Sequence, residues 1–189
     1  MKTDITIKKV KLTPRMRVIA ELVEKHACEG MTLIDVGCDH GYIPIYCVQS
    51  GFVEHAIAVD IRPGPMMRAR ENVARFKLED KIELLLSDGL DKIERVARNI
   101  VVIAGMGGYE IRDILARRRV VLCGGALSSG EDLERLDERQ AEHSEIYVIG
   151  AQKSIPLLLE FFNENGYKIL EQTQVNDRGK EYSFYVVAV

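Results

Sequence analysis

The feature that most constrains the fold is a regular alternation of short apolar runs with amphipathic helical segments along the 189-residue chain. Apolar runs bounded by glycine or acidic residues are typical of buried strands. The runs predicted as strands are residues 32–36, 55–60, 81–86, 100–104, 145–149, 167–175 and 181–189. Strands that alternate with helices are joined by right-handed crossovers, so we predict an α/β fold with a doubly wound, mostly parallel, seven-stranded sheet.

The two ends of the chain add different elements to this pattern. Near the N-terminus, Thr13 is a typical N-cap and Pro14 fits the first helical position, which predicts a helix over about residues 13–29. Near the other end, residues 176–179 (Asn-Asp-Arg-Gly) are typical of a hairpin turn. We therefore expect an antiparallel C-terminal hairpin and, from the length, a single domain over residues 1–189.

Composition and charge exclude several classes of protein. A net charge of −3 argues against a uniformly basic protein that coats nucleic acid, although a local basic face remains possible. No apolar stretch approaches the roughly 18 residues of a membrane span. The four cysteines form no C-x-x-C pair, and the four histidines never pair with a cysteine at metal-ligand spacing. We expect a cytoplasmic protein with reduced cysteines, no metal, no membrane contact and no obligate protein partner.

The turns that follow the strands are where a ligand is expected, because doubly wound sheets bind ligands beyond the carboxyl ends of their strands. Gly37 follows the first strand, between Asp35 and Asp39. Asp60 ends the next strand, at the spacing of about 20–25 residues that lets a carboxylate bind both ribose hydroxyls. Asp88 follows the third strand and is placed to accept from an adenine amino group. Each acid alone fits a helix cap or solvated turn, but together they favour a nucleoside-bearing cofactor.

Asp39 decides between cofactors, because it occupies the place of the second glycine in the G-x-G-x-x-G fingerprint. A carboxylate there repels a pyrophosphate but attracts the cationic ammonium and sulfonium of S-adenosylmethionine. We therefore predict S-adenosylmethionine rather than a nicotinamide dinucleotide. The glycine-rich turn at residues 103–108 lies where the methyl donor meets its acceptor, with a simple strand-to-helix turn as the alternative reading.

Taken in order, the motifs resemble those of the bacterial tRNA (adenine(22)-N1)-methyltransferases, a family of class I S-adenosylmethionine-dependent enzymes with a Rossmann-like fold. The matching segments are L-T-x-R-M at 12–16, D-V-G-x-D-H-G-Y-I-P at 35–44, A-x-D at 58–60, D-G-L at 88–90 and I-A-G-M-G-G at 103–108. The resemblance is close over residues 12–115 and looser over 155–189. It implies methyl transfer to N1 of adenine 22, with tRNA as the substrate.

The resemblance also implies roles for individual residues. The residues expected to bind the cofactor are Asp35, Gly37, Asp39 and His40 at the methionine moiety, Asp60 and Ile61 at the ribose, Asp88 and Gly89 at the adenine, and Ala104 beside them. The residues expected to border the acceptor base, which we assign to catalysis, are Gly105, Met106 and Gln152. In the family, Arg15 lies near the entrance, where it is expected to meet a tRNA phosphate, with a plain surface arginine as the alternative. Independently of the resemblance, the basic residues Arg68 and Arg75 fit either an RNA contact or a solvated helix face. A run of three arginines at 117–119 fits either a solvated helix face or a further RNA contact.

The chain departs from the family pattern in three places. Residues 149–152 read I-G-A-Q where the family usually has Q-P or S-P, and residues 117–144 form an atypical segment. The C-terminal helical hairpin with which family members hold tRNA does not follow before Val189. Two alternatives therefore stay open: a small-molecule methyltransferase, which needs no basic face, and a catalytically silent module that binds S-adenosylmethionine or RNA.

Overall fold

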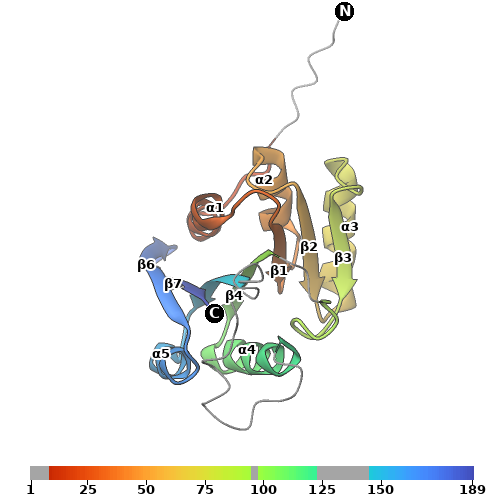
Figure 1. Cartoon of the computed structure of the whole chain (residues 1–189). Coiled ribbons are helices and arrows are strands. Elements are labelled where there is room, and N and C mark those ends of the chain that lie inside the picture. Colours follow the sequence, from red (N-terminus) through yellow and green to blue (C-terminus); the bar gives the residue numbers. More distant parts are fainter. Residues whose placement is uncertain (1–8, 95–97, 123–144) are drawn as a thin grey trace, which may run out of the picture.

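The computed structural model describes residues 9–94, 98–122 and 145–189, so most of the predicted atypical segment, residues 123–144, lies outside the described residues. The described strands form one sheet in the order β3-β2-β1-β4-β5-β7-β6 (Figure 1). They are β1 (Thr32–Val36), β2 (His55–Asp60), β3 (Ile82–Leu86), β4 (Asn99–Met106), β5 (Glu145–Ala151), β6 (Lys168–Asp177) and β7 (Lys180–Ala188). Strands β1 to β5 pair in parallel, and β7 lies antiparallel between β5 and β6. The predicted seven-stranded α/β fold with a C-terminal hairpin is thus confirmed.

The hairpin between β6 and β7 is tighter than predicted, because only two residues join the strands. Arg178 and Gly179 both have positive φ, 54° and 76°. Two such residues in succession match the type I′ turn, whose twist suits antiparallel strands. The side-chain oxygen of Asn176 accepts a hydrogen bond from the Gly179 N–H at 3.1 Å. The turn therefore holds the start of β7 at the carboxyl end of β5.

Helices cover both faces of the sheet, as a doubly wound fold requires (Figure 1). One face carries α1 (Pro14–His26), α2 (Tyr42–Ser50) and α3 (Pro63–Arg75), and the other carries α4 (Gly108–Leu122) and α5 (Ile155–Glu164). Successive residues of β1 serve the two cores, since Leu33 packs in the first and Ile34 in the second. Among the described residues, no helix combines the length and apolar character needed to cross a membrane.

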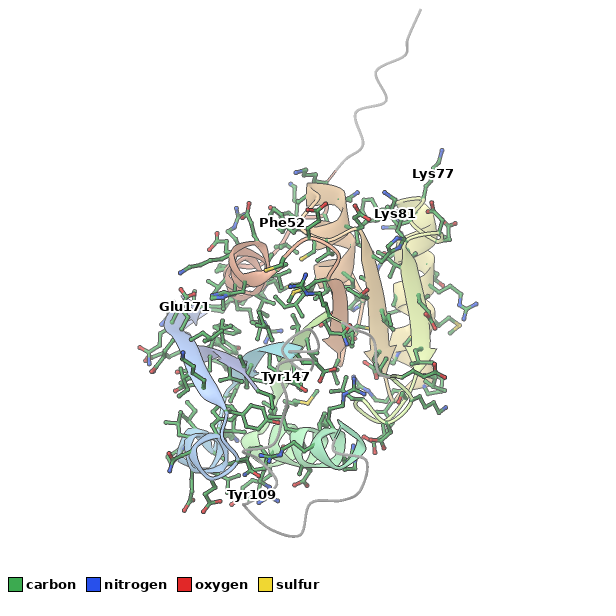
Figure 2. The ribbon with its side chains drawn as sticks, viewed as in Figure 1. Phe52, Lys77, Lys81, Tyr109, Tyr147 and Glu171 are labelled. Carbon is green, nitrogen blue, oxygen red and sulfur yellow. The ribbon has the colours of Figure 1, made fainter. Side chains whose placement is uncertain are left out.

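Helix α1 begins as predicted and ends earlier. The Thr13 hydroxyl accepts from the Met16 N–H at 3.4 Å, as an N-cap does. The helix ends at His26 because Ala27 is extended, with ψ at 135°. At this end the Lys25 ammonium and the His26 ring lie 2.9 Å and 2.6 Å from the carboxylate of Glu171 on β6, which is labelled in Figure 2. These contacts attach α1 to the far edge of the sheet.

A buried ion pair joins α4 to the amino ends of the central strands. Arg118 and Glu145 are only 2% and 3% exposed, and the Arg118 Nε lies 3.2 Å from a Glu145 carboxylate oxygen. Asn99 donates to the same carboxylate at 3.2 Å, and the Tyr147 hydroxyl also donates to it. Burial alone raises the pKa of Glu145, but the bonds from Arg118 and Tyr147 outweigh it and lower that pKa. The middle arginine of the 117–119 run is therefore structural and belongs to no RNA-binding face.

Candidate active site

The turn after β1 is fastened directly to the end of β2. The backbone N–H groups of Gly37 and Cys38 both donate to the Val59 carbonyl, at 2.8 Å and 2.9 Å. The Asp39 N–H donates to the Asp60 carboxylate at 3.3 Å. The acidic residues predicted from two separate turns thus share one hydrogen-bonded unit at the carboxyl edge of the sheet.

Gly37 suits its position because of its backbone conformation, and it lies against Met106. Its φ is +76°, which favours glycine, and a Cβ added there would lie 2.9 Å from the Met106 methyl carbon. Met106 belongs to the glycine-rich turn that ends β4. The first and fourth strand-end turns therefore meet at Gly37 and Met106.

Two cavities open at this edge of the sheet. The first, here called the Asp60 cavity, has a volume of about 310 Å³. Its lining includes Asp60, Ile61, Asp88, Gly89, Met106 and Glu110. The second, here called the Asp35 cavity, has a volume of about 210 Å³. Its lining includes Arg15, Asp35, Asp39, His40, Tyr182 and Phe184. Both cavities are lined by Gly37, Ala104 and Gly105, so a single elongated ligand can occupy the two together.

The carboxylate of Asp60 is buried and held by backbone donors. One oxygen accepts from the Arg62 N–H at 2.9 Å, and the other from the Asp39 N–H at 3.3 Å. The side chain is 3% exposed. The Arg62 Nε–H also reaches the first oxygen, at 3.5 Å. A carboxylate oxygen has two lone pairs, so the oxygen bonded to Asp39 keeps one for a ligand hydroxyl, and at the other oxygen a hydroxyl must compete with the long Arg62 contact. This fits the ribose-binding role predicted for Asp60.

Asp35 and Cys38 set the electrostatics of the Asp35 cavity. Burial, together with the nearby Asp60 charge, raises the pKa of Asp35 to about 7. Burial and the surrounding carboxylates raise the pKa of the Cys38 thiol above its ordinary value, so it stays neutral. A cation in this cavity favours the ionised form of Asp35. The cavity therefore suits a positively charged ligand.

Asp88, which lines the Asp60 cavity, is paired with an arginine. Arg117 of α4 donates to the Asp88 carboxylate at 3.0 Å and to the Asp91 carboxylate at 2.9 Å. The hydrogen bond to Asp91, partly offset by burial, raises the pKa of Arg117. Arg119 donates to the Asn165 carbonyl. Each arginine of the 117–119 run thus has a partner within the fold, and Arg117 orients the loop that carries Asp88.

The structure gathers most, but not all, of the predicted site residues. All nine residues predicted to bind the cofactor line one or both cavities, as do Gly105 and Met106. Gln152 is exposed on the loop after β5 and lines neither cavity. Arg15 lines the Asp35 cavity, and Arg68 lies 3.8 Å from the Asp39 carboxylate. Arg75 ends α3, about 10 Å further along the helix than Arg68, and so lies away from this edge.

Several lining residues lie outside the sequence motifs, and Tyr182, Phe184 and Glu110 are the ones that bear on the chemistry of the site. Tyr182 and Phe184 come from β7, which reaches the site only because it inserts between β5 and β6. Glu110 lies in the first turn of α4 and lines the Asp60 cavity. No spacing in the sequence marks the two aromatic residues, whereas Glu110 lies two residues after the glycine-rich turn, which is a signal that could have indicated it.

The comparisons with known proteins agree with this geometry. The methyltransferase domain family matches residues 12–185. The tRNA (adenine(22)-N(1))-methyltransferase of Bacillus subtilis is 27% identical over 177 residues, which cover 94% of this chain and 65% of the relative. The chain therefore spans less than two thirds of that relative's length.

Two solved structures resemble the fold. The crystal structure of the Bacillus subtilis M1A22 tRNA methyltransferase TrmK matches with a TM-score of 0.71 at 23% identity, over 94% of this chain and 66% of that one. A candidate tRNA (m1A22) methyltransferase from Streptococcus pneumoniae, in complex with S-adenosyl-L-methionine, matches with a TM-score of 0.69 at 29% identity, over 90% of this chain and 71% of that one. These findings confirm the resemblance that the motifs predict.

Proposed function

Because the chain belongs to the methyltransferase domain family, we propose that it transfers a methyl group from S-adenosylmethionine to N1 of an adenine in tRNA, at position 22. The observation that carries this proposal is the pair of joined cavities, each with a buried carboxylate, at the carboxyl edge of the sheet. The similarity to the Bacillus subtilis enzyme supports the choice of acceptor.

The two cavities fit the two halves of the cofactor. The Asp60 cavity would hold the nucleoside, with the ribose hydroxyls at Asp60 and the adenine near Asp88 and Gly89. The Asp35 cavity would hold the methionine moiety, with its ammonium near the carboxylates of Asp35 and Asp39. The sulfonium would then lie at the shared lining residues, beside Gly105.

The chain has to position the reactants more than it has to activate them. S-adenosylmethionine supplies a methyl group on a cationic sulfonium, and adenine N1 has an in-plane lone pair that takes this methyl without prior deprotonation. Gly105 and Met106 border the junction of the cavities and would hold the base in line with the methyl group. Such positioning can supply roughly 7–11 kcal/mol of the barrier in favourable cases. We propose no nucleophile and no strong base among these residues, and Gln152 would act only if its loop moves toward the junction.

The acceptor atom lies on the base-pairing edge of adenine, so the base must leave its stack to react. Arg15 and Arg68 lie beside the open Asp35 cavity and would contact phosphates of the flanking nucleotides. An RNA that also contacts Arg75 must follow α3 for about 10 Å. We therefore propose that tRNA contacts the carboxyl edge of the sheet and the side of α3.

The test is a methyl-transfer assay on unmodified tRNA with radiolabelled S-adenosylmethionine. We expect label in the tRNA, a reverse-transcription stop at adenine 22, and no transfer to a tRNA with guanine at that position. Cofactor binding without any transfer would instead identify a silent module. Transfer to small molecules but not to tRNA would identify a small-molecule methyltransferase.

A further inference from the structure

The Asp35 cavity has an acidic end and an aromatic end. Asp35, Asp39 and His40 lie on or beside the turn after β1, where the methionine moiety is proposed to bind. The opposite lining comes from α1, β5 and β7 and includes Arg15, Gly150, Tyr182 and Phe184. The cofactor's only aromatic group, its adenine, is proposed to lie in the Asp60 cavity, so the rings of this second end face whatever approaches the sulfonium, while the Arg15 guanidinium can also pair with the cofactor's carboxylate.

Arg15 and Tyr182 form a cation–π pair in this lining. The Arg15 guanidinium carbon lies 5.3 Å from the centroid of the Tyr182 ring, within the distance of about 6 Å that defines such pairs. Both side chains are partly exposed, although the residues following Tyr182 on β7 are buried. Tyr182 thus presents a ring that is held in place and still open to the cavity.

Gly150 explains how the aromatic lining reaches the cavity. Gly150 pairs with Phe184 across β5 and β7. A Cβ at Gly150 would lie 2.6 Å from the Phe184 ring and 2.9 Å from the Ala104 side chain. The glycine within the unusual I-G-A-Q segment therefore makes room for an aromatic ring beside β4.

We propose that the Arg15–Tyr182 pair is the surface on which the acceptor base stacks during methyl transfer, so that Tyr182 is a base-binding residue. Proteins that bind extruded bases stack them on aromatic rings or on arginine guanidinium planes, and this pair offers both. The pair lines the same cavity as the proposed methionine site, which brings a stacked base within reach of the methyl group. The inference rests on the proposed function for the identity of the base as an adenine.

Transfer kinetics test the pair against a matched control. Tyr182→Leu keeps apolar bulk but removes the ring, and we expect it to lower kcat/KM for tRNA by roughly 5- to 100-fold, the range that one base–aromatic stack contributes. Its affinity for S-adenosylmethionine should stay within about twofold of wild type, and Tyr182→Phe should restore transfer because the ring alone is needed. The control is Tyr46→Leu, since Tyr46 forms a similar pair with Lys9 but lines neither cavity.

A binding measurement tests the stack even if the chain does not methylate tRNA. Tyrosine rings are labelled with carbon-13, and the Tyr182 resonance is identified from its loss in Tyr182→Phe. Adenosine 5′-monophosphate is then added to the protein saturated with S-adenosylhomocysteine. We expect a ring-current shift at Tyr182 and none at Tyr46.

The outcomes separate the two proposals. Absence of tRNA methylation by the wild-type chain overturns the proposed function alone, and the Tyr182 resonance then decides the stacking surface. An unmoved Tyr182 resonance overturns the stacking surface. So does a Tyr182→Leu variant that methylates tRNA as well as wild type.

Discussion

At the scale of single residues, the site depends on carboxylates that are costly to bury. Asp35 and Asp60 end neighbouring parallel strands, and both are almost fully buried. A buried carboxylate persists where it is hydrogen-bonded or where its charge serves a ligand. The Asp60 carboxylate is held by two backbone donors, whereas Asp35 has a pKa raised to about 7. We therefore expect the two residues to respond differently to substitution.

Replacing Asp60 by Asn should weaken S-adenosylmethionine binding by about 1–3 kcal/mol. The reason is that the amide group of Asn has one acceptor oxygen for the ribose hydroxyls, whereas the carboxylate has two. Isothermal titration calorimetry measures the loss. Asp113→Asn is the matched control, since Asp113 is an exposed acid paired with Arg112 outside both cavities. Equal affinities for Asp60→Asn and wild type would contradict the ribose assignment.

The raised pKa of Asp35 predicts a pH-dependent affinity for the cationic cofactor. Below pH 7 the carboxyl group is mostly protonated, and a bound cation must first displace that proton. The affinity of wild type for the cofactor should therefore rise by about five- to tenfold between pH 6 and pH 7.5. The affinity of Asp35→Asn should rise clearly less, because any pH dependence that remains in this variant comes from titration of the ligand. Parallel pH dependences in the two proteins would show that Asp35 does not face the cofactor.

The sequence predicts where a residue lies best when a motif follows a strand. The acids and glycines of the turns are recognisable because parallel strands deliver their carboxyl ends to one edge, and the structure places all of those predicted to bind the cofactor around the two cavities. Tyr182 and Phe184 were missed because β7 reverses direction and inserts beside β5, a pairing that no local pattern specifies. Arg118 was misjudged because a charged residue in a charged run looks exposed until its partner Glu145 is known.

At the scale of elements, the buried Arg118–Glu145 pair connects α4 to the amino ends of β4 and β5. The same helix begins at the glycine-rich turn of the site and carries Arg117, which bonds the loop of Asp88. Helix α4 therefore links the Arg118–Glu145 network at the amino ends of the strands to the candidate site at their carboxyl ends. The Asp60 cavity keeps its shape only if α4 is held in place, because α4 forms part of the lining.

Removing the arginine should therefore destabilise the protein strongly. Arg118→Ala leaves the Glu145 charge buried without its main partner, and we expect a loss of about 3–5 kcal/mol in the free energy of unfolding. Urea denaturation monitored by circular dichroism measures it. A double variant, Arg118→Met with Glu145→Leu, should recover only part of the stability, because it removes both charges but leaves the Asn99 and Tyr147 donors without the Glu145 acceptor. If Arg118→Ala costs less than about 1 kcal/mol, the pair does not fix α4.

At the scale of the whole molecule, strand order was predictable only in outline. The alternation of apolar runs and helices indicated a doubly wound sheet, and the hairpin signal indicated its antiparallel end. The helix and strand ends shifted by a few residues, as where Ala27 becomes extended before the predicted end of α1. The overall charge of −3 says little about an RNA surface, because the arginines proposed to contact RNA, Arg15 and Arg68, lie together at one edge of the sheet.

Salt dependence tests that edge as a binding surface. If tRNA phosphates contact Arg68, its replacement by Ala should weaken tRNA binding and reduce the slope of log affinity against log salt by about one. Lys81→Ala is the control, because Lys81 precedes β3 at the opposite edge of the sheet (Figure 2). Filter binding at several salt concentrations gives both slopes. Identical slopes for Arg68→Ala and Lys81→Ala would remove Arg68 from the footprint.

The most direct measurement is a crystal structure of the chain bound to S-adenosylhomocysteine, the product left after methyl transfer. The account predicts one molecule across both cavities, with its ribose hydroxyls on the Asp60 carboxylate and its amino group between Asp35 and Asp39. A ligand bound elsewhere, or one lying in the reverse direction with its ribose beside Asp35, would contradict it.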